Sequence, residues 1–509
     1  MELIKNMITT CETMAKGTAQ AMADGDIIVP DTKPDILKLL QVDSDACITD
    51  KYIENGKLIL CGRVNYKVLY IPDGDDEKIK SILTSMDFRQ VVDIKTTDDT
   101  EYIISKPTVA RVEFNAVNSR KLRLRAIIHI DYEVCKLNDI EITTDIEDEC
   151  IEKKTSNMCF ENAVNISEHE FTVKEKLTVV TGKNSINEIL KTDVKIYDTE
   201  YKPVTGKVVV KGIAEICILY TDSEGDIKFV ESETPFTEVL DTEGVGENSM
   251  CDIDYCVINT MCSPEPDMDG DLRDIVIDID ICASLKATES VEKEILSDCF
   301  VPYCKMKEEK SNLILKTTTE RPVSQNTLRD TIEVPQNVPS VRGVYNIMTN
   351  AIITKSELER NKIICEGRVE AYVLYLTDTP ETPVYSLKKD IPFSYMIECK
   401  NDADTSECAI KTSVKHANYS LNGSGEIEIR CVLSIECMLT KEISIENITE
   451  IETQERESRQ GIVIYFASSG EHIWDISKHY GVPCSTLCEY NGIDNDKIDK
   501  SRKLFIPMR

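Results

Sequence analysis

Hydrophobic and polar residues alternate with a period of two along several long segments of the chain. In the segment 57–70 the residues of one parity are apolar: Leu58, Leu60, Val64, Tyr66, Val68 and Tyr70. The opposite parity includes the polar residues Lys57, Arg63, Asn65 and Lys67. This alternation predicts a β-strand with one face on a hydrophobic core and the other in water.

The alternating segment occurs three times. Gly56–Ile71, Gly206–Thr221 and Asn361–Leu376 share a Lys, a Gly and a Tyr at fixed spacing. These residues are Lys57, Gly62 and Tyr70, then Lys207, Gly212 and Tyr220, then Lys362, Gly367 and Tyr375. Such self-similarity predicts three copies of one structural unit. The recurrent Gly marks either a bulge or bend in the strand or a tight packing position.

Each copy has further elements at matching places. A second alternating strand ends each copy, around residues 122–133, 274–281 and 426–436, and a shorter strand surrounds Phe88, Phe236 and Phe393. Ahead of them the pattern predicts a short helix over Pro34–Gln41, Ser185–Lys191 and Pro339–Tyr345. The expected fold is therefore mainly β. It has three tandem antiparallel β-sandwich-like domains, each with a short helix, over residues 25–160, 165–305 and 325–450.

The segment 1–24, ahead of the repeats, has apolar residues at helical spacing: Leu3, Met7, Cys11 and Met14. This spacing predicts an N-terminal helix that packs on the first domain or, alternatively, serves as a partner-binding arm.

The last fifty or so residues form a different unit. Residues 451–461 are charged and lack apolar periodicity, so they are predicted to be a linker. Residues 462–509 show the order strand, helix, helix, strand, in which Ser469 is available to cap the first helix. So small a βααβ module has little core, and Trp474, the only Trp of the chain, is expected to fill much of it.

The chain is strongly acidic, with 59 Lys and Arg against 91 Asp and Glu and a formal charge of −32. This balance argues against binding to nucleic acid or to anionic lipid. No signal peptide and no apolar run long enough to span a membrane are recognisable, so a cytoplasmic location is expected. The 20 Cys residues are then expected to be mostly unpaired and buried, as at Cys61, Cys365 and Cys431 within strand patterns.

Motifs of catalysis are scarce. Gly182-Lys183-Asn184-Ser185 lacks the residues of a phosphate-binding loop. Asp267, Asp269 and Asp271 alternate as in a calcium loop, but no Glu stands at its twelfth position, which favours a hairpin tip. No enzyme activity, cofactor or metal site is therefore expected, and an assembly protein without catalysis fits best.

The C-terminal module resembles the LysM family. The matching residues are Ser469-Gly470-Glu471, Trp474, Ile476, Tyr480-Gly481-Val482, Leu487, Asn491-Gly492-Ile493 and Leu504-Phe505-Ile506-Pro507. The resemblance implies binding of N-acetylglucosamine-containing glycan in a shallow groove between two loops. The residues that it places in this groove are Ser469, Gly470, Glu471, His472, Asn491, Gly492 and Ile493. His472 replaces a small hydroxyl residue of the family and Lys500-Ser501-Arg502 replaces a Pro-Gly turn, so docking of a protein is the expected main role of this groove.

The three repeats resemble the SPOCS domain (DUF3794) of sporulation proteins. The matching features are Val29-Pro30 with Pro34, Val334-Pro335 with Pro339, and the strand with the recurrent Gly and Tyr. Three such repeats before one LysM module are similar to the SipL-type family of spore coat morphogenetic proteins. That resemblance implies a mother-cell protein at the forespore surface whose partner is the basement ATPase of the coat, the stage IV sporulation protein A. The alternative function is glycan binding in the cell wall or cortex.

Overall fold

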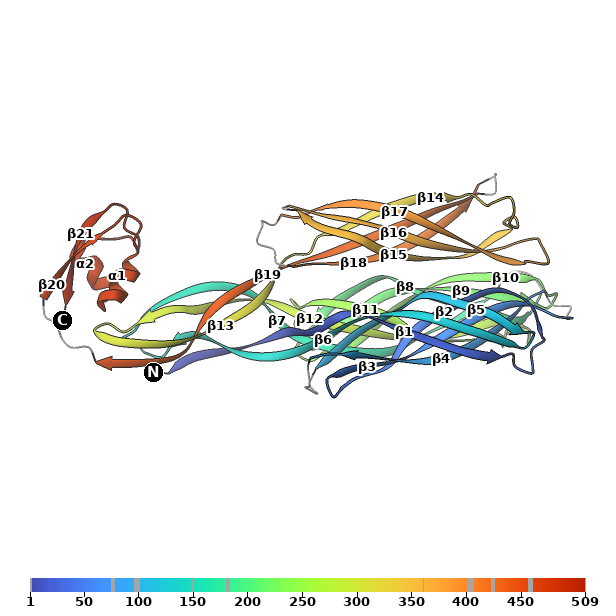
Figure 1. Cartoon of the computed structure of the whole chain (residues 1–509), viewed down its shortest axis with the longest axis horizontal. Coiled ribbons are helices and arrows are strands. Elements are labelled where there is room, and N and C mark those ends of the chain that lie inside the picture. Colours follow the sequence, from blue (N-terminus) through green and yellow to red (C-terminus); the bar gives the residue numbers. More distant parts are fainter. Residues whose placement is uncertain are drawn as a thin grey trace.

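The computed structural model describes residues 2–74, 78–95, 101–148, 150–179, 184–359, 361–400, 407–422, 426–455 and 461–508. Three β domains lie together in an elongated body, and the small C-terminal module lies beyond one end of it (Figure 1). The first residues of the chain lie at this same end.

Each β domain consists of two antiparallel sheets that enclose a hydrophobic core. In the first domain the sheets have the strand orders β2-β3-β4 and β1-β6-β5. These strands are β1 (Leu3–Ile28), β2 (Ile36–Glu54), β3 (Lys57–Pro72), β4 (Lys80–Asp93), β5 (Tyr102–Asn118) and β6 (Lys121–Ile146). The apolar parity of β3 faces apolar residues of β6 across the core, so the predicted sandwich is confirmed.

The other two domains repeat this arrangement. The second has the sheets β8-β9-β10 and β11-β12-β7, and the third has β15-β16-β17 and a sheet of β13, β14 and β18 on β19. In the third domain β13 and β14 together take the place of a single first strand. The strands of the second domain are β7 (Glu152–Thr178), β8 (Ile186–Val204), β9 (Lys207–Asp222), β10 (Ile227–Asp241), β11 (Met250–Pro266) and β12 (Leu272–Phe300). Those of the third are β13 (Cys304–Glu320), β14 (Val323–Ile332), β15 (Gly343–Glu359), β16 (Lys362–Leu376), β17 (Val384–Glu398), β18 (Glu407–Leu421) and β19 (Ile427–Glu455).

The recurrent Gly lies at one structural position in all three domains. Gly62 pairs with Phe88, and the equivalent pairs are Gly212 with Phe236 and Gly367 with Phe393. A Cβ atom on Gly62 would lie only 2.3 Å from the Phe88 ring. The strand itself is unbroken, and the register shift lies in the neighbouring strand β2, between Ile48 and Asp50. The Gly is thus a tight packing position beside a bulge, because the Phe ring occupies the place of a side chain.

The recurrent Tyr lies in the core of each domain. Tyr70, Tyr220 and Tyr375 are at most 2% exposed, which confirms the prediction from their spacing. The Tyr70 hydroxyl donates a hydrogen bond to the Pro34 carbonyl at 3.1 Å, and Tyr375 does the same to Pro339 at 3.0 Å. In the first and third domains, the buried Tyr therefore holds the proline-containing segment ahead of strand β2 or β15.

The three predicted short helices are wrong. Strand β2 begins at Ile36, β8 at Ile186 and β15 at Gly343, so these segments are strands or the turns ahead of them. Each of the three strands pairs along its length with the long central strand of its sheet. This non-local pairing overrides the helical preference of a proline in a first turn.

The predicted N-terminal helix is also wrong, because residues 3–28 form strand β1, which pairs with β6 throughout. The inward side chains of its second half are small and alternate: Ala19, Ala21 and Ala23 are buried, while Gln20 and Met22 are exposed. This period of two is the signal that the helical spacing of the larger apolar residues obscured.

In each domain, the first strand (β1, β7 or β13) and its partner (β6, β12 or β19) extend beyond the sandwich as a two-stranded ribbon. The three ribbons together form a stalk. We use the name stalk for the pairs 3–13 with 135–146, 152–162 with 289–300, and 304–318 with 440–455. Apolar residues of the three ribbons meet inside it. Ile146, Leu296 and Ile451, at equivalent repeat positions, share one cluster, and Ile8, Phe160 and Leu315 share another. β19 continues to Glu455, so the first half of the predicted linker is strand, and residues 456–460 lie outside the described residues.

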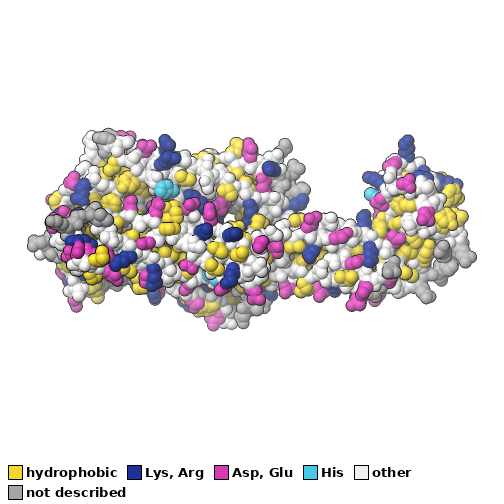
Figure 2. Space-filling model, turned by 180° about the vertical axis from the view of Figure 1, so that it is seen from behind, with side chains coloured by type: hydrophobic (Ala, Val, Ile, Leu, Met, Phe, Trp, Pro, Cys, Tyr) yellow, Lys and Arg dark blue, Asp and Glu magenta, His cyan; other side chains and the backbone are white. Residues whose placement is uncertain are grey.

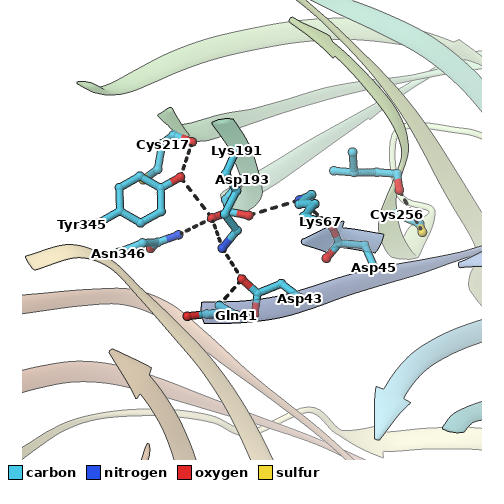
Figure 3. A network of polar contacts seen from close by, with 11 residues as sticks. Gln41, Asp43, Asp45, Lys67, Lys191, Asp193, Cys217, Cys256, Tyr345 and Asn346 are labelled. Carbon is cyan, nitrogen blue, oxygen red and sulfur yellow. Dashed lines mark hydrogen bonds and ion pairs between the residues drawn. The ribbon is translucent and has the colours of Figure 1, made fainter. Parts of the chain in front are cut away.

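The three sandwiches meet around a buried ionic cluster, which we call the hub: Gln41, Asp43, Lys67, Lys191, Asp193, Tyr345 and Asn346. Lys191 is fully buried, and its Nζ lies 2.5 Å from Asp43 of the first domain and 2.8 Å from Asp193 of its own domain (Figure 3). Tyr345 and Asn346 of the third domain each contact Asp193 at 3.2 Å. Apolar residues of all three domains pack beside the hub, including Leu69, Leu219 and Leu374 at equivalent repeat positions.

Candidate functional site

The C-terminal module has the predicted βααβ order. Its elements are β20 (Gly461–Ala467), α1 (Ile473–Tyr480), α2 (Cys484–Asn491) and β21 (Arg502–Met508), with β20 antiparallel to β21. Gly481 and Gly492 end the helices in the left-handed conformation, with φ of 68° and 56°, which glycine adopts without steric cost. The core consists of apolar residues from all four elements: Ala467, Ile473, Ile476, Val482, Leu487, Ile493, Ile498, Leu504 and Ile506.

Two loops that the family resemblance singled out lie side by side on this module. The loop between β20 and α1, residues 468–472, is joined by backbone hydrogen bonds to the loop between α2 and β21. Gly470 N–H donates to the Ile498 carbonyl at 2.8 Å, and Ile498 N–H donates to the Glu471 carbonyl at 2.9 Å. The Ser469 hydroxyl donates to the Asp499 carbonyl at 2.7 Å, so Ser469 ties the loops together instead of capping α1.

Glu471 and His472 have different surroundings in the first loop. The Glu471 carboxylate accepts hydrogen bonds from the Tyr465 hydroxyl at 3.1 and 3.2 Å, which holds it against β20. The His472 side chain is 43% exposed, and its Nδ1 lies 3.3 Å from Asp496 of the other loop. His472 therefore offers a polar ring at the junction of the two loops.

Two residues that the resemblance placed in the groove hold the module together instead. The Asn491 side-chain oxygen accepts the Phe505 N–H at 2.7 Å and its amide donates to the Phe505 carbonyl at 2.8 Å, which fixes β21 on α2. Ile493 is 8% exposed and belongs to the core. Of the residues that the resemblance assigns to the groove, Ser469, Gly470 and Gly492 are exposed and His472 is partly exposed.

Trp474 does not fill the core of the module, contrary to the prediction. It lies between the module and the stalk, where its ring packs edge-on against Phe300 at a centroid distance of 5.1 Å. Its indole N–H donates a hydrogen bond to Asp298 at 2.7 Å. Aliphatic residues fill the core of the module, and the large Trp474 ring packs at the interface with the stalk instead.

Charged residues complete this interface, which the sequence analysis did not find. Lys478 Nζ lies 2.5 Å from Asp298 and 3.2 Å from Glu308, and Tyr303 N–H donates to the Gly481 carbonyl at 2.8 Å. Although burial opposes it, hydrogen bonds from Lys478 and Trp474 hold the pKa of Asp298 below its ordinary value. The stalk thus holds the module through α1. Figure 2 shows the module beyond a narrow part of the body.

The segment with Asp267, Asp269 and Asp271 forms a hairpin turn between β11 and β12. In this turn Asp267 accepts backbone hydrogen bonds and its carboxylate lies 3.1 Å from the Arg273 guanidinium. In the described part of the chain, no group of three or more His, Cys, Asp or Glu side chains is arranged to hold a metal ion. No helix among the described residues is long and apolar enough to span a bilayer.

Comparison with known families agrees with this architecture. The SipL, SPOCS domain family matches residues 35–117, 185–265 and 340–422, one match in each β domain. The LysM domain family matches residues 468–507. No curated protein and no solved structure matches the chain significantly. Both families are binding-type domains without catalysis. From the matched residues, the chain is a SipL-type protein with three SPOCS domains followed by one LysM domain.

Proposed function

We propose that the protein is a non-enzymatic spore coat assembly protein that tethers coat layers to the forespore surface. In this proposal it works in the mother-cell cytoplasm and binds the basement ATPase of the coat, the stage IV sporulation protein A. The observation that carries the proposal is the domain content, three SPOCS domains and one LysM domain.

The arrangement of the domains supports a tethering role. The hub joins the three sandwiches, and the stalk joins the long strands of the three domains. The SPOCS domains therefore form one body rather than three independent domains on flexible linkers. The stalk then holds the LysM module at one end through Trp474 and Lys478. A tether benefits from such order because a binding module held in place loses less entropy when a partner binds.

Capture of the ATPase by the purified protein tests the proposal. The full chain, a chain ending at Glu455 and the variant His472→Ala are compared as baits for purified stage IV sporulation protein A. The truncation keeps all of β19, which pairs with β13 up to this residue. We expect capture by the full chain and weaker capture by the truncated chain. Failure of the full chain to bind the ATPase would refute the proposed partner.

Glycan binding is the second candidate function, and the LysM match favours it. His472 is the informative position because it is exposed between the two loops, whereas Ile493 is buried and its replacement would disturb the core. Titration of the protein with N-acetylglucosamine oligomers, with Ile493→Val as a folding control, measures this activity. If His472→Ala abolishes oligomer binding while capture of the ATPase is unchanged, the groove is a glycan site and not the docking site for the ATPase.

A further inference from the structure

A cavity of about 220 Å³ lies next to the hub, where strands of all three domains meet. Its lining comes from β2 and β3 of the first domain, β8 and β9 of the second and β15 of the third. Lys67, Asp193 and Asn346 belong both to the hub and to the cavity wall (Figure 3). Sites for drug-sized ligands usually measure ~300–1,000 Å³, so this cavity suits one small molecule.

The hub residues that line the cavity have their charges neutralised within the protein. Lys67 Nζ lies 2.7 Å from the Asp45 carboxylate and 3.1 Å from the Asp193 carboxylate. The Asp193 carboxylate also lies 2.8 Å from Lys191 Nζ. These groups therefore leave no unbalanced charge for a ligand.

One cation and one carboxylate of the same cavity are not paired in this way. Lys195 of β8 and Glu215 of β9 both line the cavity, and they stand directly opposite each other in the ladder. Among the residues that the structure describes, neither side chain forms an ion pair or a hydrogen bond. Burial lowers the pKa of Lys195, although the carboxylate of Glu215 opposes this shift. The neighbouring carboxylate thus compensates only part of the cost of burying the cation.

The equivalent positions in the other two repeats are neutralised. They are positions 45 and 65 in the first repeat and 350 and 370 in the third. Each of these pairs contains a single charged residue: Asp45 pairs with Lys67 at 2.7 Å, and Glu370 pairs with Lys388 at 3.0 Å. In the described structure, only the second repeat has at these positions a cation and a carboxylate that lack ion pairs.

A hydroxyl group and an apolar surface complete the cavity. The Thr349 Oγ1 atom is buried and has no hydrogen-bond partner among the described residues. A buried hydroxyl without a partner costs free energy, so an acceptor supplied by a ligand stabilises it. Cys217, Ile347 and Met348 line the same cavity. The wall therefore offers a cation, a carboxylate, a hydroxyl donor and apolar contacts to one molecule.

We propose that this cavity binds one zwitterionic α-amino acid with a small aliphatic side chain. The carboxylate of the ligand accepts hydrogen bonds from Lys195 and Thr349, its ammonium group donates to Glu215, and its side chain contacts Met348. Residues opposite each other in a ladder have Cβ atoms ~4.5–5.5 Å apart, so the two charges of the ligand must be close together, as they are on one α-carbon. A simple anion fits less well, because it would lie beside the Glu215 carboxylate and leave it unpaired.

The test titrates the full-length protein with single amino acids near neutral pH by isothermal titration calorimetry. We expect one molecule of alanine, valine or leucine to bind per chain, and aspartate and lysine to bind more weakly because their charged side chains would meet the apolar wall. N-acetylvaline lacks the ammonium group and valinamide lacks the carboxylate. Each should bind at least ~10-fold more weakly than valine, since each loses a hydrogen bond between charged groups.

Two variants locate the site. Lys195→Met and Glu215→Gln should each weaken valine binding at least ~10-fold. Neither residue has an ion pair to lose, so both variants should keep the unfolding midpoint of the free protein. The matched control is Glu370→Gln, which changes the equivalent carboxylate of the third repeat and should leave the affinity for valine unchanged.

Measurements on the wild type make the test independent of the variants. The proposal would be overturned if no aliphatic amino acid bound at millimolar concentrations. Binding of N-acetylvaline or inorganic phosphate as tightly as valine would also overturn it, because the site would then select an anion and not a zwitterion. A Lys195→Met variant that keeps the wild-type affinity would show that the amino acid binds elsewhere, and would equally contradict the proposal.

Discussion

Replacement of Lys191 by Met should destabilise the junction of the three domains. The variant keeps the length of the side chain but removes the cation between Asp43 and Asp193, both of which lie within 2.8 Å of Nζ. Asp193 then keeps Lys67, at 3.1 Å, as its nearest cation. Removing one member of a buried ion pair costs about 3–5 kcal/mol, because the remaining charge is left without its partner.

We expect the Lys191→Met variant to lose about 3 kcal/mol, at the low end of this range, because Lys67 and Gln41 still compensate the two carboxylates. For a unit of ~150 residues this corresponds to a fall of roughly 6–12 °C in the unfolding midpoint. Calorimetry and urea unfolding of the full chain at neutral pH measure this change. The exposed variant Lys207→Met, which breaks the surface pair with Asp241, should cost less than about 0.5 kcal/mol.

The double variant Lys191→Met with Asp193→Asn is the critical comparison. It removes both charges together and leaves Lys67 paired with Asp45 at 2.7 Å, so it should regain at least half of the loss. The reasoning would be refuted if Lys191→Met were as stable as the wild type, or if the double variant lost the sum of the two single losses.

The pH dependence of the hub follows from two pKa shifts. Burial alone would raise the pKa of Asp193 and lower that of Lys191, but the ion pairs hold the pKa of Asp193 far below and that of Lys191 above the ordinary values. The contribution of the hub should accordingly be constant between about pH 5 and 9. It should begin to fall below ~4, where Asp193 of the unfolded chain takes up a proton, and above ~10.5, where Lys191 of the unfolded chain loses its proton.

Three further predictions follow from the packing and from the interface with the LysM module. Gly367→Ala should destabilise the third domain by about 1–3 kcal/mol in urea unfolding, since its Cβ would lie 2.2 Å from the Ile352 carbonyl oxygen, whereas Gly343→Ala, which meets open space, should be neutral. Asp298→Asn should loosen the module from the stalk without unfolding it, and the fluorescence of the only Trp should become more accessible to quenchers, while circular dichroism stays unchanged. The lowered pKa of Asp298 implies that this fluorescence is constant above the ordinary Asp pKa of ~3.9 and changes only as the pH falls below it; a transition near neutral pH would contradict the ion pair with Lys478.

The sequence by itself determined the repeated strands and their inward faces. Alternation of apolar and polar residues fixes which side of a strand meets a core, and Tyr70, Tyr220 and Tyr375 are all buried as their spacing predicts. The repeat also marked the Gly that a Phe ring covers, although only the structure decided between a bulge in the same strand and a tight packing position. The LysM residues were recognisable because the local order of strand, helix, helix and strand is contained in 48 residues.

Only the tertiary structure decided which strands pair over long distances and which residues meet between domains. Residues 3–28 are a strand because β6, more than a hundred residues later, supplies their hydrogen-bond partners. Positions 41, 191 and 346 are equivalent in the three repeats, yet they carry Gln, Lys and Asn. Of these three residues, only Lys191 is a cation, and it is buried between two carboxylates. The sequence pattern likewise predicts Trp474 in the core of its module, but in the structure its ring packs on Phe300 and its N–H donates to Asp298. A local pattern records how one segment divides its residues between core and water, but not which distant segment will cover it, because that choice depends on the joint packing of all three domains.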